Sequence, residues 1–316
     1  MLTSGKRSGT RCVGATWQIG FLLLGGVIVA VLLTDMARTV PVLGPSRSST
    51  PRSQATQMIT RELIGQSQAD PVVAQANAIR DRLKLPVGVR RLAEHVQDAS
   101  TKENYDEVDE LDSQGRVVSL TTFSSDQLRT AIRFDMAPQV STPIDQSTGV
   151  ADALKAATGL GLVGGAPDRS YDDTSTGGWV AQWDRTANGV PVRGDGTLVR
   201  VWADGRIASV SHKTHPLAAA PLALIDASSA TQQVKASMQQ LVPGSSNSLT
   251  FQTPGLEWVR PNGAFDASRS VAEDPVGRLA WVVNVEPADR SASSFTLLTF
   301  FIDAGDSTLL GGDVVE

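Results

Sequence analysis

Cysteine is almost absent from this chain, and its scarcity removes one means of stabilising the fold. The 316-residue sequence contains a single cysteine, Cys12, so no disulfide can form within the chain. Residues 39–316 contain none. With hydrophobic residues at 41% and charged residues at 19%, the composition is that of a globular protein. We therefore expect an ordinary hydrophobic core to stabilise this part of the chain.

Histidine is also scarce, and this argues against several kinds of enzyme. A zinc peptidase of the His-Glu-x-x-His type needs two histidines four residues apart, and His95, His212 and His215 do not provide them. His212 and His215 are three residues apart at the end of a predicted strand, where alternation directs their side chains to opposite faces. No Gly-x-Ser-x-Gly elbow or nucleotide-binding loop is present. We expect no catalytic residue, metal or cofactor.

A basic surface is missing as well. Residues 39–316 carry 24 basic and 32 acidic side chains, a net charge of −8. A nucleic-acid-binding domain needs clustered positive charge, so we expect no nucleic-acid partner.

The longest uncharged run lies at the N-terminus. The 23 residues between Arg11 and Asp35 carry no charge and would span ~34 Å as a helix, enough to cross a bilayer. This predicts a single-pass transmembrane helix over 13–34, with the basic residues 1–12 in the cytoplasm and the C-terminal part extracytoplasmic. A cleaved signal peptide is the alternative. Cleavage would place Asp35 at the −3 position, which fits poorly, so the sequence favours an uncleaved anchor in the cell membrane.

The rest of the chain reads as a tether followed by three parts. Residues 39–58 are rich in Pro, Ser, Thr and Arg and predict a flexible tether. We expect a divergent helix-hairpin part over 59–140, a second part over 141–221 and a third over 222–316. Their predicted helices cover 71–84, 89–97, 149–158 and 226–241, and strands follow the second, third and fourth of them. Ser147 or Thr148 is the expected N-cap of the third helix, and Asp226 is that of the fourth.

Residues 178–211 carry the clearest strand pattern. Trp179, Ala181 and Trp183 alternate along 178–183, and residues 198–203 show the same period of two. This period predicts strands of an antiparallel sheet. Asn188-Gly189 and Asp204-Gly205 are typical of tight hairpin turns. Residues 279–285 resemble 178–183, with Trp281 in the place of Trp179, and this indicates an internal repeat.

The same segment resembles the FTP motif of fungalysin and thermolysin-type metalloprotease propeptides. The matching residues are Gln182, the run 188–192 (NGVPV), 199–202, Asp204-Gly205 and 207–211. Residues 222–316 resemble the related PepSY domain, through the 301–305 segment FIDAG. In the propeptides such segments assist folding of the protease and inhibit it. Similar domains also occur on membrane-anchored bacterial proteins that regulate signalling kinases or spore-cortex hydrolases.

The resemblance implies an α+β fold of tandem PepSY-like units, each a helix packed on an antiparallel sheet, after an N-terminal transmembrane helix. It also implies a binding or regulatory module without the protease, which holds, inhibits or assists an envelope partner such as a secreted peptidase or cell-wall hydrolase. A cryptic envelope enzyme and a purely structural envelope protein are the alternatives. The residues expected to contact a partner are Trp183, Asn188, Gly189, Val190, Pro191 and Trp202. For the two tryptophans, a place in the core is the competing interpretation.

Overall fold

The computed structural model describes residues 59–98, 103–137, 139–241, 249–265, 274–288 and 295–315. All of them belong to one compact unit, Leu33–Glu316. The predicted segments 1–12, 13–34 and 39–58 lie outside the described residues. Within the described part, no helix is both long and apolar enough to cross a membrane.

The first third of the described chain contains one helix and five strands. These are β1 (Ile59–Leu63), α1 (Gln66–Leu83), β2 (Arg90–Asp98), β3 (Glu103–Leu111), β4 (Val117–Ser124) and β5 (Gln127–Arg133).

The middle third contains one helix and four strands. These are α2 (Gln146–Gly159), β6 (Arg169–Asp173), β7 (Gly178–Ala187), β8 (Val190–Val201) and β9 (Ile207–Lys213).

The last third contains one helix and five strands. These are α3 (Ala227–Leu241), β10 (Leu249–Phe251), β11 (Gly255–Val259), β12 (Arg278–Pro287), β13 (Leu297–Asp303) and β14 (Leu309–Val315).

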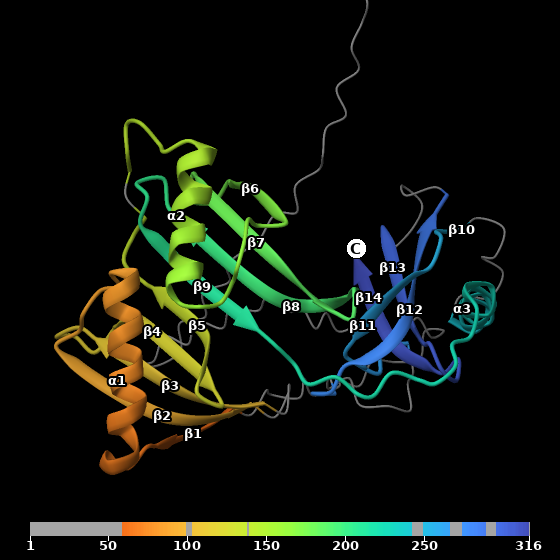
Figure 1. Cartoon of the computed structure of the whole chain (residues 1–316), viewed down its shortest axis with the longest axis horizontal. Helices are drawn as coiled ribbons and strands as arrows, with labels where there is room; N and C mark the ends of the chain where they lie inside the picture. Colours follow the sequence, from red (N-terminus) through yellow and green to blue (C-terminus); the bar gives the residue numbers. More distant parts are fainter. Residues whose placement is uncertain are drawn as a thin grey trace, which may run out of the picture. The chain divides into compact units, whose positions relative to one another are not determined.

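The fourteen strands of the described residues form one mixed sheet. Figure 1 shows how they are arranged. Its main path is β1-β2-β3-β4-β5-β9-β8-β11-β12-β13-β14, with β7 and β6 beside β8 and β10 beside β12. The named strands pair antiparallel except for β8 and β11, which meet in parallel at Val192 and Trp258. The predicted fold class, tandem PepSY-like units in which each helix packs on its own antiparallel sheet, is therefore wrong.

The physical reason lies at the strand edges. A separate helix-on-sheet unit would leave an edge strand with unpaired backbone groups. Here β5 pairs with β9 through Thr130–Ile132, and β8 pairs with β11 through Val192. The sequence predicted that these strands would be the edges of separate sheets. In the structure they pair with each other and join the predicted sheets into one.

A second correction concerns residues 89–97, which were predicted to be helical. Arg90–Asp98 instead form β2, which pairs with β3 along its whole length and with β1 along part of it. Nine residues are too few to distinguish the helical period from strand alternation when long-range pairing competes. The helix predicted over 71–84 is present but begins at Gln66, so Pro71 lies inside it.

Both later helices begin close to their predicted starts. Asp226 caps α3 as predicted, because its carboxylate accepts a hydrogen bond from the backbone N–H of Ser229 at 2.8 Å. The cap of α2 is Asp145 rather than Ser147 or Thr148, and Asp145 accepts from the N–H of Thr148 at 2.8 Å.

Two helix-covered cores lie on this sheet. The first contains a row of directly opposed residues, Ala131, Val210, Val199 and Ala181, which run across β5, β9, β8 and β7 beneath α1 and α2. The second lies beneath α3. It contains Ala230, Val234 and Met238 of the helix with Val283, Val285, Leu298, Phe300 and Ile302 of β12 and β13.

Candidate binding site

The predicted contact segment at residues 188–191 consists of the turn between β7 and β8, Asn188 and Gly189, and the first two residues of β8. Asn188 and Gly189 have φ values of 53° and 78°, as the Asn-Gly pair predicted for a tight hairpin. Asn188, Gly189 and Pro191 are exposed, and Val190 is half-buried. This turn is therefore the accessible part of the predicted contact set.

The residues that follow the turn bind within the chain. Val192 is buried in a small cluster with Trp258, Leu279 and Ala304. Arg193 forms ion pairs of 3.2 Å with Glu257 of β11 and Asp313 of β14, two strands of the C-terminal part. The strand next to the predicted contact segment thus already has partners in the same chain.

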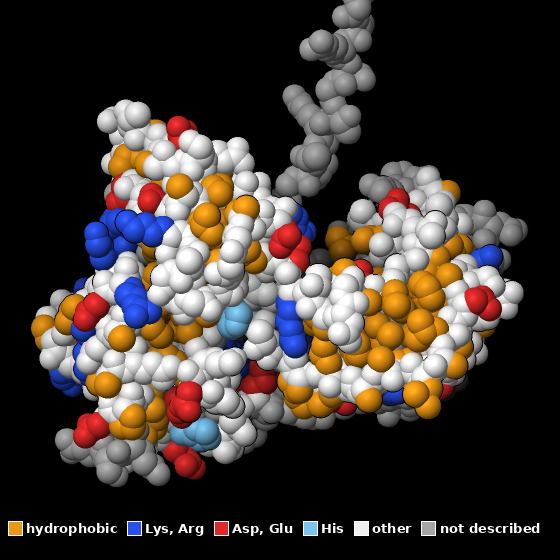
Figure 2. Space-filling view, in the orientation of Figure 1, with side chains coloured by type: hydrophobic (Ala, Val, Ile, Leu, Met, Phe, Trp, Pro, Cys, Tyr) orange, Lys and Arg blue, Asp and Glu red, His pale blue; other side chains and the backbone are white. Residues whose placement is uncertain are grey.

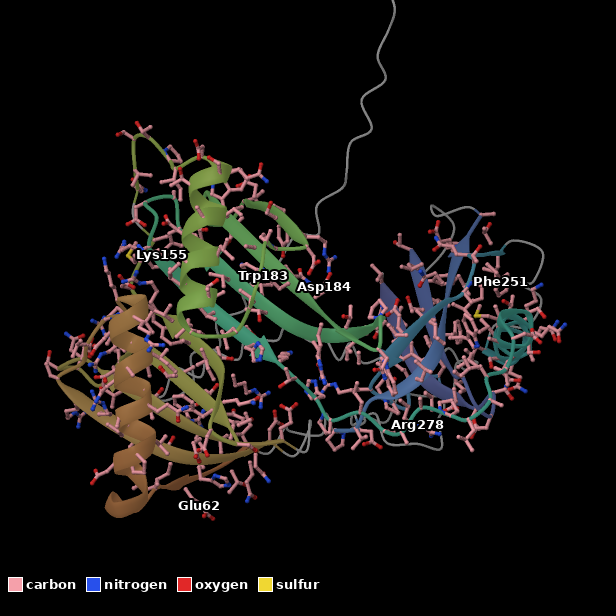
Figure 3. All side chains as sticks on the ribbon, in the orientation of Figure 1. Glu62, Lys155, Trp183, Asp184, Phe251 and Arg278 are labelled. Carbon is pink, nitrogen blue, oxygen red and sulfur yellow. The ribbon has the colours of Figure 1, made fainter. Side chains whose placement is uncertain are left out.

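The two predicted contact tryptophans lie in the interior. Trp183 is 8% exposed and belongs to the core beneath α2, where its indole N–H donates to the carbonyl of Gly165 at 2.8 Å. Its neighbour on β7, Asp184, is exposed; Figure 3 labels both side chains. Trp202 is 6% exposed, with the guanidinium groups of Arg133 and Arg206 at 5.1 and 5.0 Å from its ring. Their role in partner contact stays a prediction.

A pocket of about 380 Å³ lies between α1, the start of β5 and the residues that follow α2. Its lining combines apolar and polar side chains: Gln75, Ala78, Ile79, Arg82, Asp126, Gln127, Leu128, Leu160, Gly161, Leu162 and His212. Arg82 also donates to the carbonyl of Gly159 at 2.7 Å, which ties the C-terminal ends of the two helices together. Lys and Arg side chains gather where these ends meet (Figure 2). The size suits a small ligand or a few side chains of a peptide.

His212 is the titratable imidazole in the pocket lining. Its Nδ1 lies 2.8 Å from the hydroxyl of Thr197, which is the residue directly opposite it on β8. Burial lowers the pKa of His212; the charge of Asp195 acts in the opposite direction, and the charge of Arg185 lowers the pKa further. The ring is therefore neutral at pH 7 and suited to hydrogen bonding. Thr197 is only 3% exposed. Its hydroxyl is therefore too buried to act as a nucleophile on a substrate in the pocket.

His215 occupies a different position, in a network of charged side chains. Its Nδ1 pairs with Asp195 of β8, whose side chain is only 1% exposed, and its Nε2 lies 2.9 Å from Glu103 of β3. Arg185 pairs with Asp195 at 2.7 Å. Arg129 of β5 and Arg260, which follows β11, both pair with Glu103. The two histidines thus have different hydrogen-bond partners.

The network favours the charged forms of Glu103, Asp195 and His215. Burial alone would raise the pKa of Glu103, but the hydrogen bond from His215 and the charge of Arg129 lower it to about 2. Burial likewise acts to raise the pKa of Asp195, and the hydrogen bonds from His215 lower it overall. Burial would lower the pKa of His215, but its hydrogen bonds with Asp195 and Glu103 raise it. The network joins β3, β8 and the C-terminal part through charge-assisted hydrogen bonds.

Sequence reading missed both the pocket and the network. The pocket combines four segments that are far apart in the chain, and Glu103 lies 112 positions from His215. The one available signal was the histidine pair His212 and His215, which marked the right segment of the chain but did not reveal the partners of either histidine.

No family model and no curated protein matches the chain. Among solved structures, it is similar to the Bacillus megaterium YpeB C-terminal domain, with a TM-score of 0.36 and 11% sequence identity. The similarity covers 81% of this chain and 99% of that one. Similarity at this level assigns no family, so the FTP/PepSY resemblance continues to depend on the residues that carry it.

Proposed function

We propose that this protein is an FTP/PepSY-like binding and regulatory module that holds, inhibits or assists an extracytoplasmic partner such as a secreted peptidase or cell-wall hydrolase. The extracytoplasmic location comes from the charge pattern around residues 13–34 and is part of the proposal. The recognition chemistry would be protein–protein contact, without a reaction carried out by this chain.

The observation that supports this function best is the pocket between α1 and α2. Ile79, Leu128 and Leu162 give it apolar walls, and Arg82 and Asp126 add charges of both signs. Recognition sites combine apolar area with a few polar groups that orient the ligand. An apolar side chain of a partner segment would enter the pocket, and its flanking polar groups would meet the charged residues.

A substitution that fills the pocket tests this function. Ala78 lines the pocket from an exposed position on α1, so Ala78→Trp places an indole in it without removing a core side chain. Ala74→Trp is the matched control, because Ala74 is exposed on the same helix but does not line the pocket.

The full-length chain would first be cross-linked in the envelope of its source organism to identify the bound peptidase or hydrolase. The dissociation constant and the activity of that purified enzyme would then be measured with each variant. We expect Ala78→Trp to weaken binding by about tenfold or more and to abolish the effect on activity, whereas Ala74→Trp leaves both unchanged. Equal binding by wild type and Ala78→Trp would remove the pocket from the interface. Hydrolytic activity of the chain alone would instead favour an enzyme.

A further inference from the structure

Three carboxylates from two neighbouring strands converge on one face of the sheet. Glu107 and Asp109 are two residues apart on β3, so their side chains leave the same face. Glu94 of β2 is directly opposite Glu107 in the strand register. One oxygen of each of these three side chains lies within 4.8 Å of the others.

This face is the one that the helices do not cover. Val108, between the two acids of β3, points the other way and belongs to the core beneath α1. Glu107 and Asp109 therefore lie on the opposite face, and both are nonetheless buried. Carboxylates so placed need a positive partner or a proton to offset the loss of water.

One carboxylate of the three lacks a complete set of partners. Asp109 is only 8% exposed, and its Oδ1 is buried without a hydrogen-bond partner among the described residues. The same holds for the hydroxyl oxygen of Thr122, which is directly opposite Glu107 on β4. Buried polar atoms in native proteins are nearly always satisfied, so two such atoms around one cluster indicate a missing partner.

The charge of the cluster is also incompletely balanced. Arg61 of the edge strand β1 pairs with Glu94 at 2.9 Å and with Glu107. One guanidinium beside three ionised carboxylates leaves two negative charges. A bound ion with two positive charges would make the group neutral.

We propose that Glu94, Glu107 and Asp109 form a binding site for a hard divalent cation, with Thr122 as an additional oxygen donor. The donors are oxygen atoms only, the set that Ca²⁺, Mg²⁺ and Mn²⁺ prefer over softer metals. Arg61 lies at the more exposed side of the cluster, so the ion enters past it and the guanidinium remains as a second counter-charge.

Isothermal titration of the chelator-treated full-length chain with CaCl₂, and separately with MgCl₂, tests this site. The site predicts saturable binding of one ion per chain and a melting temperature that rises with ion concentration. Asp109→Asn removes a ligand charge with little change in shape and is expected to lower the affinity by about tenfold or more. Asp106→Asn is the matched control: it lies on the same strand but pairs with His95 at 3.0 Å on the other face, and it should bind as wild type does.

Each outcome decides the proposal. No saturable binding of either ion by the wild type would mean that a proton on Asp109 replaces the cation, and would overturn it. Equal affinity of wild type and Asp109→Asn would place any bound ion elsewhere. If Asp109→Asn fails to fold by circular dichroism, Glu94→Gln provides the same test, because Glu94 is the more accessible ligand. Retained wild-type affinity in that variant would likewise reject the site.

Discussion

The part of the sheet beneath α2 and the part beneath α3 share one set of hydrogen bonds to the backbone, but different side chains fill their cores. Beneath α2, the indole N–H of Trp179 donates to the carbonyl of Ile144 at 3.0 Å, and the N–H of Ile144 donates to Ala203. Beneath α3, the indole N–H of Trp281 donates to Ile225 at 3.0 Å, and the N–H of Ile225 donates to Ala304. In both, the next residue is the aspartate that caps the helix. What repeats is therefore this set of contacts, within one sheet.

The difference between the two parts lies in how volume is divided between helix and strand. The helix face over the first core is made of small residues: Gly149, Ala153 and Ala157. At the corresponding positions of α3 stand Ala230, Val234 and Met238. The strand shows the reverse, with Trp183 in β7 where β12 has Val285. A close-packed core needs a constant total volume, so a large strand residue is matched by a small helix residue.

Substitutions that exchange the side-chain volumes of helix and strand should cause the largest losses in the free energy of unfolding. Trp183→Val would leave a cavity and lower the free energy of unfolding by about 3 kcal/mol. Ala157→Met would overpack the same core and cost about 2 kcal/mol. In the double variant the methionine fills part of the cavity, so the combined loss should fall short of the sum by about 1 kcal/mol or more. Urea unfolding of the four proteins measures this coupling.

The matched change in the other part is Met238→Ala, which opens a cavity beneath α3. Combined with Trp183→Val, it should give an additive loss, because the two side chains belong to different cores. If Trp183→Val and Ala157→Met instead lower the free energy of unfolding additively, the large strand residue is not compensated by the small helix residue.

A buried ion pair with a histidine is present in the part beneath α2, where Asp195 of β8 pairs with His215. In the part beneath α3, the uncharged Thr296 precedes Ala304 by the same spacing at which Asp195 precedes Ala203. His215→Gln should lower stability at pH 6 by about 2 kcal/mol, because Asp195 and Glu103 lose a charged hydrogen-bond partner.

The stabilisation that His215 provides should depend on pH, because the pKa of His215 is raised in the folded protein. Its contribution is thus complete below the unfolded pKa of about 6.5 and is lost as the pH rises through the folded value. The wild type and His215→Gln should converge at alkaline pH in urea unfolding. A gap that stays constant from pH 6 to pH 9 would show that His215 contributes packing alone. His212, whose pKa is lowered, is common to both proteins and cancels.

The third prediction tests the shared contacts directly. Trp179→Phe and Trp281→Phe each remove one indole N–H and leave a carbonyl, of Ile144 or Ile225, without that donor. We expect each to cost about 1 kcal/mol, with the two values alike. Thermal unfolding of both variants decides this. A loss in only one of them would mean that the two contact sets differ in energy despite their matching geometry.

The sequence was most informative where a local rule determines the backbone. Asn188-Gly189 predicted a turn that the positive φ values of both residues confirm, and Asp226 predicted the start of α3. These features depend on three or four neighbouring residues. The resemblance between 178–183 and 279–285 is also matched by equal contacts of Trp179 and Trp281.

Sequence reading was least informative where distant segments compete. The helix predicted over 89–97 is a strand because β1 and β3 provide backbone partners that local spacing does not reveal. The separate sheets are joined through Val192 and Trp258, residues that no local pattern pairs. At the predicted contact site, alternation could place Trp183 on one face of a strand but could not show that α2 covers that face.

The helix caps offer the smallest change and the finest comparison. Asp145→Ala and Asp226→Ala each remove a carboxylate that accepts a hydrogen bond from the third residue beyond it, so each should lower the melting temperature by less than the tryptophan variants do.

The stabilisation by the Asp226 cap should also depend on pH. The hydroxyl of Ser228, followed by the N–H and hydroxyl of Ser229, lowers the pKa of Asp226 to about 2. A lowered pKa gives stability that is present above the unfolded value of about 3.9 and is lost as the pH falls through the folded one. The deficit of Asp226→Ala relative to wild type should therefore shrink as the pH falls from 4 towards 2. A deficit of Asp226→Ala that is the same at pH 3 and pH 6 would show that the ionised carboxylate is not what stabilises the start of α3.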